Sequence, residues 1–298
     1  MRKIAIIFIM ITVCWVTSAL AAPMQVAIGV APLKYIAQKI GGNLILATVL
    51  VPAGADAHTY EPKPSQMRAV AGAAMYLSVG LEFEEAWEPR LKAANPKLLF
   101  VHTDKDLSKL PMPAGHEDHH KPAAKEHGSK DHHAEESDPH VWVAPSQMKR
   151  IAANIAAAFA KADPAHAKVY EENLASLLRE VDGVDGQLRA TFSAIPAAKR
   201  GFLVFHPAWG YLAKDYGLTQ RAIEFEGTEP SPKRLGAIIS EAKAKGDKVI
   251  FVQPQMSRRT ADSIAKAIGA RLIVADPLAE DWATNLLGVA ANFRDALK

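Results

Sequence analysis

Short apolar runs alternate with amphipathic segments in the first third of the chain. The apolar runs span residues 25–30, 46–51, 74–79 and 97–101. The segments between them have the spacing of helices that bury one face, over residues 32–40, 64–73 and 83–94. Strands that alternate with helices are typical of βαβ units around a mainly parallel sheet. The pattern predicts a first α/β lobe.

The same alternation returns in the last third of the chain. Apolar runs span residues 201–206, 218–223, 248–253 and 271–276. Helical patterns separate them over residues 207–217, 231–246 and 258–269. A second α/β lobe is therefore predicted.

The segment between the two lobes is predicted to be helical. It is dense in Ala, Leu, Glu, Lys and Arg, which are good helix formers. Pro164 fits the first turn of a new helix, with Asp163 as its N-cap. One buried face is expected to consist of Val169, Leu174, Leu177, Leu178, Val181, Val184 and Leu188. We expect an N-terminal lobe over residues 22–163, a rigid linker helix over 164–193 and a C-terminal lobe over 194–298.

The N-terminus has the layout of a secretory signal peptide. A basic start precedes an apolar run from Ile4 to Val16, and an Ala-x-Ala cleavage site ends at Ala21. A membrane anchor is the alternative, but the run is shorter than the roughly 20 residues that span a bilayer. Cys14, the single cysteine, follows Val13 inside the apolar run, which argues against lipidation. We expect cleavage of residues 1–21 and export to the periplasm.

The mature chain is nearly neutral and has no cysteine. Removal of Arg2 and Lys3 lowers the formal charge from +3 to +1, so the charge gives no reason to expect a nucleic-acid partner. Without disulfides, an exported chain relies on its core or on a ligand.

Candidate ligands follow the predicted strands. In open α/β sheets ligands bind beyond the carboxyl ends of the strands, and His58, His206 and Asp276 lie at such positions. His140 lies in "DPHVWV", close to the lobe boundary. Three imidazoles and one carboxylate are a metal-binding set in outline. The alternative is that each histidine is a surface residue and that Asp276 opens an Asp-Pro turn.

Four motifs resemble one protein family in both content and order. They are "VPAGADAHTYEPKPSQ" (51–66), "DPHVWVAP" (138–145), "FHPAWGYLAKDYGL" (205–218) and "ADPL" (275–278). Together they are similar to the ZnuA-like group, the extracytoplasmic metal-binding proteins of zinc and manganese ABC transporters. The resemblance implies two Rossmann-like lobes, a rigid linker helix and one metal ion in the cleft. It also implies that His58, His140 and His206 are ligands and that Asp276 lies in or near the coordination sphere.

The ligand types favour Zn²⁺ as the bound ion. Zinc prefers four-coordinate sites with nitrogen, sulfur and oxygen donors, whereas manganese favours more oxygen ligands. The manganese-binding members resemble this pattern but have an acidic residue at the position of His206. Some zinc-specific relatives have Glu immediately before the first ligand, where this chain has Ala57. Asp276 is therefore the expected fourth ligand, with water as the alternative.

A histidine-rich segment separates the first lobe from His140. Residues 111–137 combine Pro, Gly and charged residues with six histidines, which are His116, His119, His120, His127, His132 and His133. Such a segment has little to bury, so a mobile loop is expected. It is either a solvated insertion or an auxiliary zinc collector of low affinity.

Three further residues are assigned supporting roles. Glu61 is predicted to accept a hydrogen bond from the imidazole of His58. Trp142 and Trp209 either shield the site from water or belong to the core. The acidic residues Glu224, Glu226 and Glu229 either approach the cleft or stay solvated.

The resemblance implies a zinc-binding protein that serves a membrane permease powered by a separate ATPase. The chain itself has no phosphate-binding Gly-x-x-x-x-Gly-Lys motif. A monomer is expected. A manganese- or iron-binding homologue is the first alternative. An exported zinc hydrolase is the second, but neither a His-Glu-x-x-His helix nor a nucleophile elbow is present.

Overall fold

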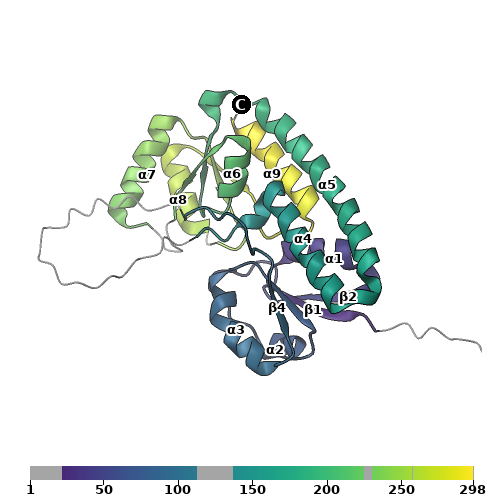
Figure 1. The fold of residues 1–298 in the computed structure, drawn as a ribbon. Helices are drawn as coiled ribbons and strands as arrows, with labels where there is room; N and C mark the ends of the chain where they lie inside the picture. Colours follow the sequence, from purple (N-terminus) through teal and green to yellow (C-terminus); the bar gives the residue numbers. More distant parts are fainter. Residues whose placement is uncertain (1–21, 113–136, 225–229, 257, 298) are drawn as a thin grey trace, which may run out of the picture.

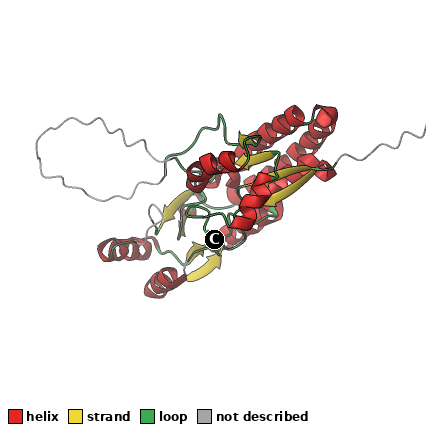
Figure 2. Ribbon diagram, turned by 90° about the horizontal axis from the view of Figure 1, so that it is seen from below, coloured by secondary structure: helices red, strands yellow, loops and turns green. Residues whose placement is uncertain are grey.

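The computed structural model describes residues 22–112, 137–224, 230–256 and 258–297. The predicted signal peptide lies outside this range. Two four-stranded parallel sheets form the centres of two lobes, which confirms the predicted α/β architecture (Figures 1 and 2). Within the described residues, no helix has both the length and the apolar character needed to cross a bilayer.

The first sheet has the strand order β2-β1-β3-β4. Its strands are β1 (Met24–Ile28), β2 (Ile45–Val49), β3 (Met75–Ser78) and β4 (Leu99–His102). Every pair is parallel, and the register places Met24 beside Ile45 and Val26 beside Met75. The connecting helices are α1 (Ala31–Gly41), α2 (Pro64–Ala71) and α3 (Glu82–Ala94). A 3-10 turn, η1 (Gly42–Leu44), precedes β2.

The second sheet repeats this topology with the order β6-β5-β7-β8. Its strands are β5 (Gly201–Val204), β6 (Thr219–Ala222), β7 (Val249–Val252) and β8 (Arg271–Val274). The helices are α6 (Gly210–Tyr216), α7 (Pro232–Lys245), α8 (Arg258–Ile268) and α9 (Trp282–Leu297). A 3-10 turn, η4 (Ala197–Lys199), precedes β5. The sequence pattern did not predict α9.

Local sequence explains where several helices begin and end. Pro32, Pro64, Pro145 and Pro232 each occupy the first turn of a helix, where proline loses no intrahelical hydrogen bond. Helix α6 ends at Gly217, whose φ of 65° lies in the left-handed region that glycine adopts easily.

Two long helices connect the lobes. Helix α4 (Pro145–Ala162) follows the 3-10 turn η2 (Val141–Val143), and α5 (Ala167–Ser193) follows the turn η3 (Pro164–His166). Helix α5 runs along both lobes and contacts α1 and α4 as well as α6 and α9 (Figure 1). It thus occupies the place of the predicted linker helix.

Two details of the linker prediction were wrong. Asp163 makes no side-chain cap; its carboxylate instead accepts hydrogen bonds from His166 and from the hydroxyl of Tyr170. Val169 is 41% exposed, whereas the neighbouring Tyr170 is fully buried. The 3-10 turn shifts the start of the α-helix to Ala167, and the buried face begins at the aromatic residue.

Candidate metal centre

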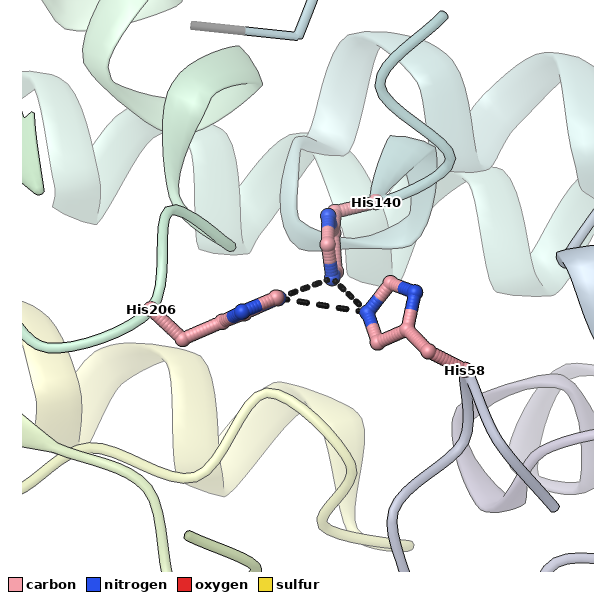
Figure 3. A group of neighbouring side chains, drawn as sticks. All are labelled: His58, His140 and His206. Atoms are coloured by element: carbon pink, nitrogen blue, oxygen red, sulfur yellow. Dashed lines mark hydrogen bonds between the residues drawn. The ribbon is translucent and has the colours of Figure 1, made fainter. Parts of the chain in front are cut away.

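Three histidines from separate segments meet between the lobes. His58 lies in the loop after β2, His140 directly precedes η2, and His206 follows β5. Their Nε2 atoms converge, and each pair is 3.2 Å apart (Figure 3). Among the described residues, this is the one group of three or more His, Cys, Asp or Glu side chains in which each offers a ligand atom within 4.8 Å of the others.

Each of these imidazoles has a carboxylate at its other ring nitrogen. The Nδ1 of His58 lies 2.9 Å from Glu82 Oε2, and that of His140 lies 2.7 Å from Asp138 Oδ1. The Nδ1 of His206 lies 3.2 Å from an oxygen of Glu224. Carboxylates at these positions orient metal-binding imidazoles and make them more basic ligands.

This hydrogen bonding fixes the chemical form of the neutral histidines. An ionised carboxylate only accepts hydrogen bonds, so each Nδ1 carries the proton and each Nε2 presents a lone pair. Three lone pairs that face one another without a proton repel, and a cation removes this repulsion. Tetrahedral coordination at a Zn–N distance of about 2.0–2.1 Å places nitrogens about 3.3–3.4 Å apart, close to the spacing seen here.

The three histidines differ in their electrostatic surroundings. Burial lowers the pKa of His140 to about 4, against the opposing effect of its hydrogen bond to Asp138. Burial also acts to lower the pKa of His58, but the hydrogen bond and charge of Glu82 outweigh it, so the net pKa is raised. Burial acts to raise the pKa of Glu82, but the bond to His58 lowers it overall.

The predicted fourth ligand lies outside the histidine group. Asp276 follows β8, and its Oδ1 accepts hydrogen bonds from Gln255 Nε2 and from the backbone N–H of Leu278, both at 2.9 Å. The structure thus brings together three of the four predicted ligands. A small cavity of about 20 Å³ lies beside them, and His58, His140, Gln253 and Gln255 are among the residues that line it.

The supporting residues differ from the prediction in part. The role assigned to Glu61 belongs to Glu82, because Glu61 is exposed and Glu82 makes the hydrogen bond to His58. Trp142 packs against His140, with ring centres 5.3 Å apart, and its Nε1 donates to the carbonyl of Pro277. Trp209 is a core residue that packs on Phe293.

Sequence reasoning did not identify Glu82, Asp138, Gln253 or Gln255. Asp138 lies two residues before His140 in the quoted motif. Gln253 directly follows β7 and Gln255 lies two residues further on, so the positions of these three residues offered a signal. Glu82 carried no such signal. Glu224 approaches the cleft, which was one of its two predicted placements; Glu226 and Glu229 lie outside the described residues.

The six histidines of the predicted loop also lie outside the described residues, but both ends of that segment are described. Pro111 and Ser137 form an isolated antiparallel bridge. The hydroxyl of Tyr211 on α6 accepts from the backbone N–H of Leu110 and donates to the carbonyl of Asp138, at 2.9 and 2.7 Å. The segment thus leaves and rejoins the fold beside Asp138, the partner of His140.

Comparison with known proteins agrees with this site. The high-affinity zinc uptake system protein ZnuA of Bacillus subtilis is 30% identical over 234 residues, which are 77% of this chain and 70% of that protein. The zinc-binding protein AdcA of Streptococcus pyogenes is 28% identical over 253 residues, 83% of this chain, and the chain spans about half (49%) of its length. A crystal structure of ZnuA superimposes on this chain with a TM-score of 0.83 at 36% sequence identity. The match covers 93% of this chain and 100% of the ZnuA chain.

The family model of the periplasmic component A of zinc-uptake complexes matches residues 26–296. This range contains both sheets except the first two residues of β1, and it includes all three histidines and their carboxylate partners. The chain therefore belongs to the ZnuA family, whose members are extracytoplasmic metal-binding components of ABC transporters and are solute-binding proteins rather than enzymes.

Proposed function

We propose that this protein captures Zn²⁺ in the periplasm and delivers it to a membrane ABC permease, which a separate ATPase subunit powers. The observation that carries the proposal is the convergence of three Nε2 atoms, each 3.2 Å from the other two and each backed by a carboxylate. The ion is the cargo of this site.

The donor set supports zinc over manganese. His58, His140 and His206 offer three neutral nitrogen donors, which suit Zn²⁺, while Mn²⁺ favours more oxygen ligands. The names of the B. subtilis and S. pyogenes relatives also refer to zinc. Asp276 or a water molecule completes the four-coordinate site.

The histidine-rich segment is proposed to collect zinc weakly and to raise its local concentration near the site. Imidazoles in a segment without fixed geometry bind borderline metals at several places. The bridge between Pro111 and Ser137 supports this role, because it fixes both ends of the segment next to the partner of His140.

Residues 1–21 are proposed to be a cleaved signal peptide without lipidation, and the mature protein to act as a monomer. The remaining chain is divided as the sequence predicts, into an N-terminal lobe (22–163), a linker helix (164–193) and a C-terminal lobe (194–298). Family membership supports an extracytoplasmic location.

Calorimetric titration of the metal-free mature protein with Zn²⁺ and Mn²⁺ tests the proposal. One tight zinc site and weak manganese binding are expected, and the tight site persists when residues 116–133 are deleted. His58→Ala and His206→Ala abolish it. His102→Ala is the matched control, since His102 is exposed and lies outside the histidine group.

Two results would overturn the proposal. Loss of tight binding on deletion of residues 116–133 would place the real site in that segment. Tighter binding of Mn²⁺ than of Zn²⁺ would identify a manganese carrier.

A further inference from the structure

Two buried amide atoms beside the histidines have no hydrogen-bond partner among the described residues. They are Nε2 of Gln253 and Oε1 of Gln255. Gln253 is only 7% exposed, and both glutamines line the cavity of about 20 Å³ that His58 and His140 also line. Buried polar groups are nearly always paired, so two orphans in one cavity next to a cation site need an explanation.

The orientation of Gln255 is set by its neighbour. Its Nε2 donates to Asp276 Oδ1 at 2.9 Å, and a carboxylate only accepts, so the amide oxygen is the atom left over. Asp276 Oδ1 is in turn engaged by two hydrogen bonds. The cavity wall therefore presents one donor, from Gln253, and one acceptor, from Gln255.

The topology places these groups at the point where a ligand is expected. Gln253 directly follows β7, and His206 follows β5. These are the two central strands of the order β6-β5-β7-β8. The connection after β5 leads to β6 and the connection after β7 leads to β8, so the two diverge toward opposite edges of the sheet. Ligands of open α/β sheets bind at such switch points.

We propose that the fourth ligand of the metal is a water molecule held by Gln253 and Gln255, and that Asp276 acts through Gln255 as a positioning residue. Water accepts from Gln253 Nε2 through one lone pair and binds the metal through the other. One of its hydrogens is donated to Gln255 Oε1. The cavity has room for about one water molecule. This inference rests on the proposed metal site at the three histidines.

Substitution of Gln253, Gln255 and Asp276 distinguishes a water ligand from a carboxylate ligand. Asn at position 276 still offers an oxygen to Gln255, so Asp276→Asn is expected to change the Kd for Zn²⁺ by less than about fivefold. Gln253→Leu and Gln255→Leu each weaken zinc about tenfold or more, as is usual for groups that orient a ligand. Gln38→Leu, at an exposed position of α1, is the matched control.

The thermal stability of the metal-free protein distinguishes a role of Gln253 in coordination from a merely structural role. Leucine removes a buried amide nitrogen that has no hydrogen-bond partner among the described residues, so metal-free Gln253→Leu is expected to melt at the same or a higher temperature than the wild type. Weaker zinc binding without loss of stability identifies a role in coordination. If the variant melts lower and zinc affinity is unchanged, the inference fails.

The Co²⁺-loaded protein allows a direct test for the water ligand. In ¹⁷O-enriched water, the electron paramagnetic resonance signal of the bound Co²⁺ is expected to broaden in the wild type and in Asp276→Asn. It is expected to broaden less in both Gln→Leu variants. No broadening in the wild type, or a loss of zinc affinity of about 100-fold or more in Asp276→Asn, would show that Asp276 is the ligand. If His58→Ala binds zinc like the wild type, the proposed site itself is wrong.

Discussion

His58, His140 and His206 present the same ring nitrogen, Nε2, to one another, and His58 and His140 differ in how they bind protons. His140 is buried, and its pKa is lowered to about 4, so it stays neutral through the physiological range. The pKa of His58 is raised, because Glu82 and nearby carboxylates favour its charged form. Of these two histidines, His58 is therefore the one at which protons compete first with the metal.

Acidification is expected to weaken zinc binding. A ligand with a raised pKa is protonated early as pH falls, so the affinity decreases once pH drops below the pKa of His58, by about tenfold per pH unit. The decrease steepens further near pH 4, where His140 takes up a proton. Competition with a chelator of known pH dependence measures the curve between pH 8 and 4. An affinity that is constant from pH 7.5 to 5 contradicts this assignment.

Glu84 is a buried carboxyl group outside the metal site. Its Oε2 accepts hydrogen bonds from the backbone N–H groups of Val79 and Leu81, and Tyr76 donates its hydroxyl to Oε1. Burial raises the pKa of Glu84 to about 7. Because the folded-state pKa lies above the unfolded value, its contribution to stability is greatest below about pH 4.5 and is lost as pH rises through about 7.

Glu84→Gln is therefore expected to stabilise the protein at alkaline pH. The amide keeps an oxygen for the two backbone donors and carries no charge. Its free energy of unfolding should exceed that of the wild type by about 1–3 kcal/mol at pH 8.5, and the difference should vanish below about pH 4.5. Urea denaturation at both pH values measures it. An equal difference at both pH values would mean that ionisation of Glu84 is not the cause.

At the scale of elements, α6 holds the chain on both sides of the histidine-rich segment. Tyr211 is buried and bonds both Leu110 and Asp138, and the backbone N–H of Asp138 also donates to Leu110. Asp138 in turn binds the imidazole of His140. Tyr211 of α6 thereby positions Asp138 and, through it, a histidine of the proposed metal site.

Tyr211→Phe is expected to lower both stability and zinc affinity. Loss of the hydroxyl leaves a buried N–H and a carbonyl short of a partner, which costs about 1–3 kcal/mol. The looser Asp138 should weaken zinc binding about three- to tenfold. Tyr170→Phe is the control, because that hydroxyl binds Asp163 far from the site and its loss should leave the Kd unchanged. The same Kd for wild type and Tyr211→Phe would show that Asp138 is positioned without α6.

The strands and their order of occurrence were predictable, because each depends on local periodicity. The histidine set was implied by the resemblance to the ZnuA-like group, because His58 and His140 lie in loops and no local pattern joins them to His206. Other contacts depend on how loops fold over one another. Glu82 reaches His58 across 24 residues, and the nearer Glu61 turns to solvent. Similarly, whether Val169 or Tyr170 begins the buried face of α5 depends on a single 3-10 turn before the helix.

At the scale of the whole molecule, the two lobes share a hydrophobic core. Each sheet has a cluster of its own, around Tyr76 in the first lobe and Ile250 in the second. The largest cluster, however, contains residues of β1, of α5 and of β5, so it is continuous through both lobes. Helix α5 contacts helices of both lobes along its length. Packing of this kind favours unfolding as one cooperative unit.

Leu188→Ala is expected to destabilise both lobes equally. Leu188 is fully buried on α5 within the shared core, so its truncation should cost about 2–5 kcal/mol. Hydrogen exchange measures the opening free energy of the amides of β1 and of β7 separately. Because the core is continuous, both strands should lose the same amount. Val169→Ala on the same helix is the control; with 41% of its side chain exposed, it should cost about 0.5 kcal/mol or less. A loss confined to β7 would mean that the lobes unfold independently, and α5 would then be a connector between two separate folding units.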